Sequence, residues 1–154
     1  MIETVEGQVR VQPDGRRLKL WSETLDALSL VDRRTNRVRA RLEKYYVEPF
    51  GAVPRGPTEL GAIYVLREAP VGQAVTIAPL APVAAAKVLR RQAYRPALIA
   101  ALGQEESYFQ RAAVIAAAAP VFALTRPKAF DRLAETIAQL EANWATPPPL
   151  RAAG

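Results

Sequence analysis

The residues best suited to chemistry in this sequence are cations gathered in one short segment. Between Asp32 and Lys44 the six basic side chains are Arg33, Arg34, Arg37, Arg39, Arg41 and Lys44, against the two carboxylates of Asp32 and Glu43. Guanidinium groups match phosphate oxygens in two-bond geometry, so the segment could contact phosphates. No aromatic residue is interleaved before Tyr45, which favours a solvated surface loop. Lys44, with Arg41 nearby, is the candidate phosphate- or substrate-binding exception.

Much other chemistry is excluded by composition. The chain has no Cys and no His, which removes disulfides, thiolate nucleophiles, imidazole acid–base schemes and most zinc sites. Glu105 and Glu106 are adjacent and do not face each other on a helix. Ser22 and Ser107 have no histidine to act as base, and Ser22 is expected to cap a helix. We therefore predict no catalytic residue and no metal site.

Length and charge bound the class of protein. The 154 residues are 50% hydrophobic and 23% charged, which predicts one modest domain over 1–146, followed by a disordered proline-rich tail over 147–154. The acidic start is unlike a signal peptide, and the apolar stretch 112–124 is too short to span a bilayer. These features predict a cytoplasmic protein with no membrane partner. The net charge of +6 favours anionic partners.

Strand patterns dominate the first half of the chain. Alternation at 8–11 and 18–20 around Asp14-Gly15 predicts a β-hairpin. A short helix is expected from Ser22 to about Leu30, ending near Asp32, and a strand over 45–47. Prolines and glycines then predict a loop over 48–59. Two further strands, over 62–67 and 74–78, are expected to be largely buried.

Alanine-rich helices dominate the second half. Pro82 suits the first turn of a helix that ends near Arg90-Arg91, and a short helix over 96–102 should stop at Gly103. A third helix begins at Glu105-Glu106 and stops at Pro120. A strand over 121–124 and a last helix entered at Pro127 follow, and its apolar face is Phe130, Leu133, Ile137, Leu140 and Trp144. The predicted fold class is α+β, or part of a mixed α/β domain.

Nucleotide-binding loops are missing from the sequence. No run fits G-x-x-x-x-G-K-[ST], whose backbone amides and lysine converge on phosphates, and no run fits G-x-G-x-x-G. The chain alone is therefore expected to bind no nucleotide cofactor.

The order of the segments nevertheless resembles the latter part of the HPr kinase-like proteins, which are P-loop serine kinases related in fold to phosphoenolpyruvate carboxykinase. The resemblance runs from about Val5 to Trp144. It rests on element order and on segments of the sequence: Val9-Arg10-Val11, Arg16-Arg17-Leu18-Lys19-Leu20-Trp21, Arg41-Leu42-Glu43-Lys44-Tyr45, Ala62-Ile63-Tyr64-Val65-Leu66, Pro79-Leu80, Arg91-Gln92-Ala93-Tyr94 and Arg126-Pro127.

The resemblance implies a specific missing part. In the family a P-loop and an Asp-Asp pair, which serve ATP, magnesium and phosphoryl transfer, precede these segments; we call that portion the P-loop half. The chain would then be the scaffold and substrate-side half of an ATP-dependent serine kinase, inactive alone. Its partners would be a serine-containing protein or peptide and the P-loop half, with Lys44 and Arg41 contacting phosphate or substrate.

Three explanations of the missing P-loop half stay open. Two other classes of protein compete with the interpretation of the chain as half of a kinase. The first explanation, which we favour, is that Met1 is an internal methionine taken for a start. The second is that the chain is a truncated paralogue, and the third is that the P-loop half is separately encoded. The rival class is a basic, non-catalytic module that binds nucleic acid or an acidic protein; nucleic acid is the less favoured partner. A small structural or interaction protein is the third class.

Overall fold

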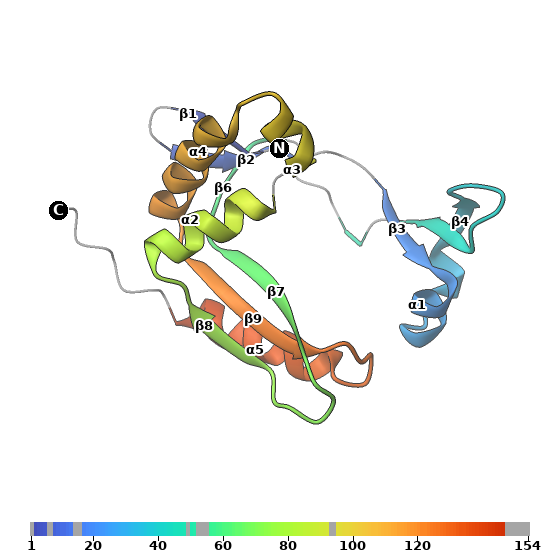
Figure 1. Cartoon of the computed structure of the whole chain (residues 1–154). Coiled ribbons are helices and arrows are strands. Elements are labelled where there is room, and N and C mark those ends of the chain that lie inside the picture. The colour runs from blue at the N-terminus through green and yellow to red at the C-terminus, as the bar shows by residue number, and fades with distance from the viewer. Residues whose placement is uncertain are drawn as a thin grey trace. The chain divides into compact units, whose positions relative to one another are not determined.

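The computed structural model describes residues 2–5, 8–13, 17–48, 50–51, 56–92 and 95–146. The chain divides into two compact units: Met1–Glu3 with Arg10–Thr58, and Thr4–Val9 with Glu59–Gly154. Both contain strands, and helices are concentrated in the second (Figure 1). The mixed α+β composition expected from the sequence is thereby confirmed, whereas a single domain over 1–146 stays a prediction.

The first unit is built on a small antiparallel sheet. Its strands are β3 (Leu18–Trp21), β5 (Lys44–Val47) and β4 (Arg34–Arg37), in the order β3-β5-β4. Helix α1 (Ser22–Ala27) and the 3₁₀ helix η1 (Val31–Arg33) follow β3 along the chain. Alternate residues of β5 point inward, so Tyr45 and Val47 are buried with Leu25 of α1. These three side chains form the core of the unit.

The expected hairpin between 8–11 and 18–20 is wrong. Strand β2 (Gln8–Val11) lies in a separate sheet, between β1 (Ile2–Val5) and β6 (Thr58–Glu59), whereas β3 pairs with β5. Pro13 has no amide hydrogen to continue the ladder directly after β2. Leu20 of β3 packs instead beside the buried Tyr45 and Val47. The turn residues 14–16 of the expected hairpin lie outside the described residues.

Helix α1 also differs from its prediction. It ends at Ala27, because Ser29 adopts the left-handed conformation with φ of 53°. Ser22 does not cap it: Trp21 is the capping residue, and no side chain there bonds a helix amide. The Ser22 amide donates to the carbonyl of Glu43 at 2.8 Å instead. The start of α1 is thus tied to the residue that precedes β5.

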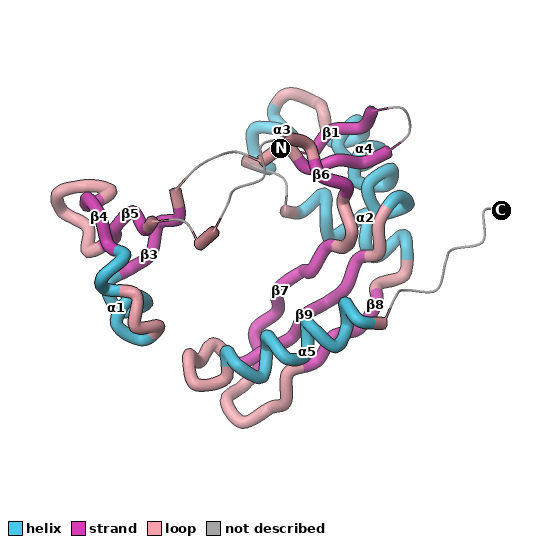
Figure 2. Tube along the Cα trace, turned by 180° about the vertical axis from the view of Figure 1, so that it is seen from behind, coloured by secondary structure: helices cyan, strands magenta, loops and turns pink. Residues whose placement is uncertain are grey.

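The second unit is a sheet covered by helices on both faces. Central strand β9 (Val121–Pro127) pairs in parallel with β7 (Ile63–Ala69) over seven residues, and antiparallel with β8 (Thr76–Pro79). Helices α2 (Pro82–Arg91) and α4 (Glu105–Ala118) lie on one face, and α5 (Leu133–Ala145) crosses the other (Figure 2). The short α3 (Pro96–Ala101) precedes α4.

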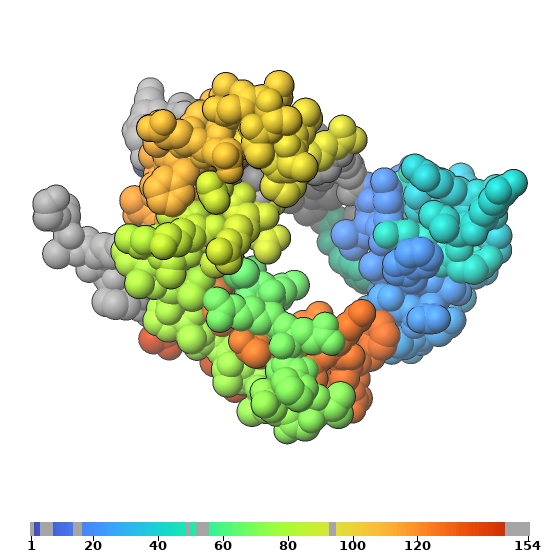
Figure 3. Space-filling model, viewed as in Figure 1, coloured from blue at the N-terminus to red at the C-terminus, as the bar shows by residue number. Residues whose placement is uncertain are grey.

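Alanines allow the helices of this unit to pack closely. Ala85 and Ala86 of α2 and Ala116 of α4 are buried against Val121 of β9. Small side chains let two helix backbones approach, and α2 and α4 pack side by side in the space-filling view (Figure 3). The alanine-rich helices predicted over these segments are confirmed, as are the starts at Pro82, Pro96 and Glu105.

Three further expectations from the sequence need correction. Strands β7 and β8 are not largely buried, because they flank the sheet and β9 alone is central. Pro127 ends β9 and does not begin a helix; α5 begins at Leu133. The segment 48–59, predicted as a loop, contains the short strand β6 at its end. The predicted tail over 147–154 lies outside the described residues.

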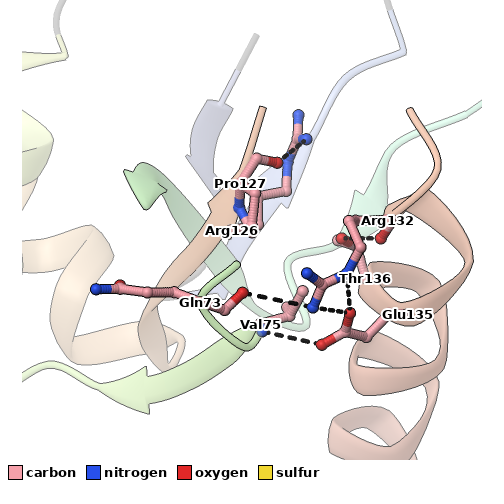
Figure 4. Close-up of polar contacts among 7 residues, drawn as sticks. All are labelled: Gln73, Val75, Arg126, Pro127, Arg132, Glu135 and Thr136. Carbon is pink, nitrogen blue, oxygen red and sulfur yellow. Dashed lines mark hydrogen bonds and ion pairs between the residues drawn. The ribbon is translucent and has the colours of Figure 1, made fainter. Parts of the chain in front are cut away.

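Helix α5 is anchored to the loop before β8 by a polar clamp (Figure 4). The Val75 amide donates to Glu135 Oε1 at 3.1 Å, and Arg132 Nε donates to Glu135 Oε2 at 2.6 Å. Arg132 also donates to the carbonyl of Gln73 at 3.4 Å. The Val75 amide, followed by Arg132, lowers the pKa of the Glu135 carboxyl below its usual value of 4.5. The clamp therefore favours the ionised carboxylate.

This clamp predicts a pH-dependent stability. A carboxyl whose pKa is lowered by folding contributes stability above its unfolded pKa, and the contribution is lost as pH falls through the lowered folded value. Acidification from about pH 6 to pH 3 should thus lower the free energy of unfolding of the parent protein more than it lowers that of a Glu135→Gln variant. Thermal midpoints measured across this range would check it. Identical pH slopes for the two proteins would contradict the role of Glu135.

Among the described residues, none of the helices is long and apolar enough to cross a membrane.

Candidate functional site

The two candidate residues from the sequence lie in the first unit, in different local structure. Lys44 begins β5 and is half-buried, whereas Arg41 is exposed in the turn that connects β4 to β5. Arg41 forms no side-chain hydrogen bond or ion pair with another described residue. The structure thus gives Lys44 a fixed position and leaves Arg41 at the surface.

Lys44 belongs to a face of the sheet that carries cations and aromatic rings in alternation. In the β3–β5 register Trp21 is opposite Lys44, and Lys19 is opposite Tyr46. The Lys44 Nζ lies 5.1 Å from the Trp21 ring centroid, and the Lys19 Nζ lies 5.4 Å from that of Tyr46. We call these four residues the Lys44 face. Because residues alternate along a strand, this face is opposite the buried Tyr45 and Val47.

Arginines surround the aromatic residues elsewhere in the unit. The Arg34 and Arg37 guanidinium carbons lie 4.7 and 5.5 Å from the Tyr45 ring centroid, and that of Arg33 lies 4.6 Å from that of Phe50. Five cation–aromatic pairs thus fall between Lys19 and Phe50. The segment 33–44 itself contains no aromatic residue, and the fold brings three of its arginines to Tyr45 and Phe50, which follow it in the sequence.

A polar network holds the turn that leads into Lys44. Arg37 Nε donates to the Tyr45 hydroxyl at 3.1 Å, and that hydroxyl donates to Glu43 Oε2 at 2.7 Å. Arg37 also pairs with Glu43 at 2.6 Å. The Tyr45 hydroxyl, followed by the Glu43 carboxylate, raises the pKa of Arg37 above its usual value. Because Arg37 and Glu43 bond to each other and to Tyr45, their side chains position β5. We therefore assign ligand binding to other cations of the unit.

Most of the protein's excess positive charge lies in this unit. The unit contains eleven Lys and Arg against seven Asp and Glu, an excess of four out of the total of +6. An anion would therefore be attracted more strongly to the first unit than to the second. Among the described residues, no group of three or more potential ligands could hold a metal ion.

Sequence reasoning missed three members of the Lys44 face, namely Lys19, Trp21 and Tyr46. The sequence carries a signal for them. In Leu18-Lys19-Leu20-Trp21 the two leucines alternate with Lys19 and Trp21, and in Lys44-Tyr45-Tyr46-Val47 Tyr45 and Val47 alternate with Lys44 and Tyr46. Pairing of the two strands would have placed all four side chains on one face.

Comparison of the chain with protein-family models, curated proteins and solved structures finds no match.

Proposed function

We propose that the chain is the scaffold and substrate-side half of an HPr kinase-like ATP-dependent serine kinase, and that it transfers phosphoryl groups only together with a P-loop half. ATP and magnesium would be held by the P-loop half, which supplies the phosphoryl donor. The Lys44 face and Arg41 would contact the anionic groups of the donor or of a serine-containing protein or peptide. Fixed cations beside a transferring phosphoryl group neutralise charge that develops in the transition state.

The observation that carries this proposal is the open edge of the sheet in the second unit. Strand β7 is parallel to β9 and ends the sheet, and no described strand pairs with its outer edge. In parallel sheets with helices on both faces, the strands are usually buried between the helix layers and flanked by further strands. Leu66 of β7 is exposed. An added strand on this edge, supplied by the P-loop half, would complete the ladder.

The gene itself offers the first test. The DNA immediately upstream of the Met1 codon, read in this frame, should encode a strand, a glycine-rich loop ending in Lys-Ser or Lys-Thr, and an Asp-Asp pair. Finding these would support a kinase whose second half is this chain. A stop codon close before Met1, with no P-loop in a neighbouring gene, would contradict the proposal and turn attention to a non-catalytic partner.

A second candidate function is favoured by the alternation of rings and lysines on the Lys44 face. Single-stranded nucleic acid is bound by aromatic side chains that stack on bases, with cations along the backbone. Trp21 is 49% exposed and lies next to two lysines, Lys44 and Lys19, in the sheet. The same face could therefore hold a short oligonucleotide.

Salt distinguishes this second candidate from the kinase. If the Lys44 face binds an oligothymidylate, affinity should fall roughly tenfold between 50 and 200 mM salt, as two or three phosphate contacts require. Trp21 emission, recorded in a Trp144→Phe variant, would report stacking, because the chain has two tryptophans. The kinase proposal predicts no measurable binding at physiological salt. Binding that survives Trp21→Leu unchanged would exclude stacking on this face.

A further inference from the structure

A cavity of about 420 Å³ opens in the second unit, beside the beginnings of β7 and β9 and the last turn of α5. None of the side chains that line it is charged. Four of its lining residues carry rings or polar groups: Tyr64 of β7, Phe122 of β9, and Asn143 and Trp144 of α5. Small-molecule sites usually have volumes of about 300–1,000 Å³ and mostly apolar walls with a few polar groups. The cavity therefore has the size and lining of such a site.

Three aromatic rings line this cavity. Those of Tyr64 and Phe122 stack with centroids 5.3 Å apart and planes 16° apart. Phe122 is only 9% exposed, so the stacked pair is held within the sheet, whereas Trp144 is 61% exposed and accessible to a ligand. Aromatic groups attract one another through offset stacking and edge contacts, in addition to the burial of apolar area. A flat aromatic ligand would therefore pack favourably against this wall.

The amide of Asn143 is oriented by its neighbour Tyr64, whose hydroxyl donates to Asn143 Oδ1 at 2.5 Å. Burial raises the pKa of the Tyr64 phenol, and a hydrogen bond with Trp144 opposes this shift. The phenol is therefore protonated at neutral pH and can act as the donor. A side-chain amide has two N–H donors besides its oxygen, and the Asn143 amide nitrogen bonds to no other described residue. These donors can bond an acceptor on a ligand.

We propose that this cavity binds an uncharged aromatic molecule whose ring carries a hydrogen-bond acceptor such as a carbonyl group. The ring packs against the aromatic wall, and the acceptor receives a hydrogen bond from the Asn143 amide. A charged ligand is disfavoured, because a charge loses its water on entering and no charged side chain lines the cavity to compensate. The site lies in the second unit and shares no residue with the Lys44 face, so it does not depend on the proposed kinase activity.

Three probes with the same ring test the ligand class: benzamide, toluene and benzoate. With Trp21→Phe in the full chain, all tryptophan emission comes from Trp144, which lines the cavity. Benzamide should change this emission saturably, with half-saturation at about 1 mM, as a good ligand of this small size can reach. Benzoate should bind at least about tenfold more weakly because of its charge. No saturable change with benzamide up to about 10 mM, or equal binding of benzamide and benzoate, would overturn the proposal.

An Asn143→Ala variant tests the hydrogen bond to the acceptor. It should weaken benzamide binding by about tenfold, as loss of one hydrogen bond does, and leave toluene binding within about twofold. Retained toluene binding would show that the cavity is still folded. The matched control is Asn36→Ala, because Asn36 is exposed on β4 in the first unit, and it should change neither affinity. Benzamide binding that is unchanged in Asn143→Ala would contradict the assigned role of the amide.

Discussion

In the proposed kinase, made of this chain and a P-loop half, replacing Lys44 with alanine is expected to lower serine phosphorylation by about a hundredfold. Loss of one fixed positive or hydrogen-bonding group that faces developing charge costs roughly 10²–10³ in rate. Lys44 is held on β5 by pairing with β3 and lies 5.1 Å from the Trp21 ring centroid, so its position does not depend on a flexible loop. The measurement is the rate of transfer of the γ-phosphoryl group to serine.

The control for this prediction is Lys87→Ala, which removes the same charge from an exposed position on α2. It should leave the transfer rate within about twofold of the unchanged protein, because an exposed charge outside the Lys44 face is screened by salt and contributes little. Both variants should unfold at the same denaturant concentration as the parent. Equal rates for Lys44→Ala and the parent would remove Lys44 from the site.

Replacing Leu25 with alanine is expected to unfold the first unit while the second stays folded. Leu25 is 1% exposed and packs with Tyr45 and Val47 in a core of three buried residues. A buried leucine cut back to alanine costs about 3 kcal/mol. A core this small rarely supplies more than about 3–5 kcal/mol of stability. The substitution would therefore remove most of the stability of the unit, and the Lys44 face with it.

The two tryptophans allow the units to be followed separately. Trp21 belongs to the first unit and Trp144 to the second. Leu25→Ala should shift the emission of Trp21, recorded with Trp144→Phe, and leave that of Trp144, recorded with Trp21→Phe, unchanged. Leu18→Ala makes the same chemical change at a half-exposed position of β3 and should leave both signals as they were. Loss of both signals together in Leu25→Ala would mean that the units unfold as one.

The helices of the second unit could be predicted from local signals. Pro82 and Pro96 mark first turns, Gly103 adopts a φ of 64° after α3, and Pro120 follows the end of α4. Each signal acts within a few residues of the helix end that it determines. Sequence reasoning therefore places these helices to within about two residues.

The pairing of strands could not be predicted in the same way. Strands β2 and β3 are near neighbours along the chain but belong to different sheets, because β3 pairs with β5, which lies much further along the chain. The packing of α5 was predicted only in part for a related reason. Of its apolar pattern, Leu133 and Leu140 are half-buried, whereas Phe130, Ile137 and Trp144 are exposed. The polar Thr136 is buried instead, beside the bonds of Glu135 to Val75 and Arg132. Both outcomes depend on contacts between residues far apart in sequence.

The candidate site was predicted in part. Lys44 and Arg41 were chosen from charge alone, and the partners of Lys44 emerge once β3 and β5 are paired, since Trp21 and Lys44 are 23 positions apart. The ligand of these cations could not be predicted from the sequence, because no short motif of the chain specifies it.

Phosphoryl transfer from γ-labelled ATP to serine, measured with the chain alone and with the P-loop half added in cis or in trans, tests the central proposal most directly. We predict no transfer by the chain alone and magnesium-dependent labelling of serine when both halves are present. The result that would contradict the proposal is the absence of labelling with both halves folded and mixed, together with salt-sensitive binding of an oligonucleotide by the Lys44 face.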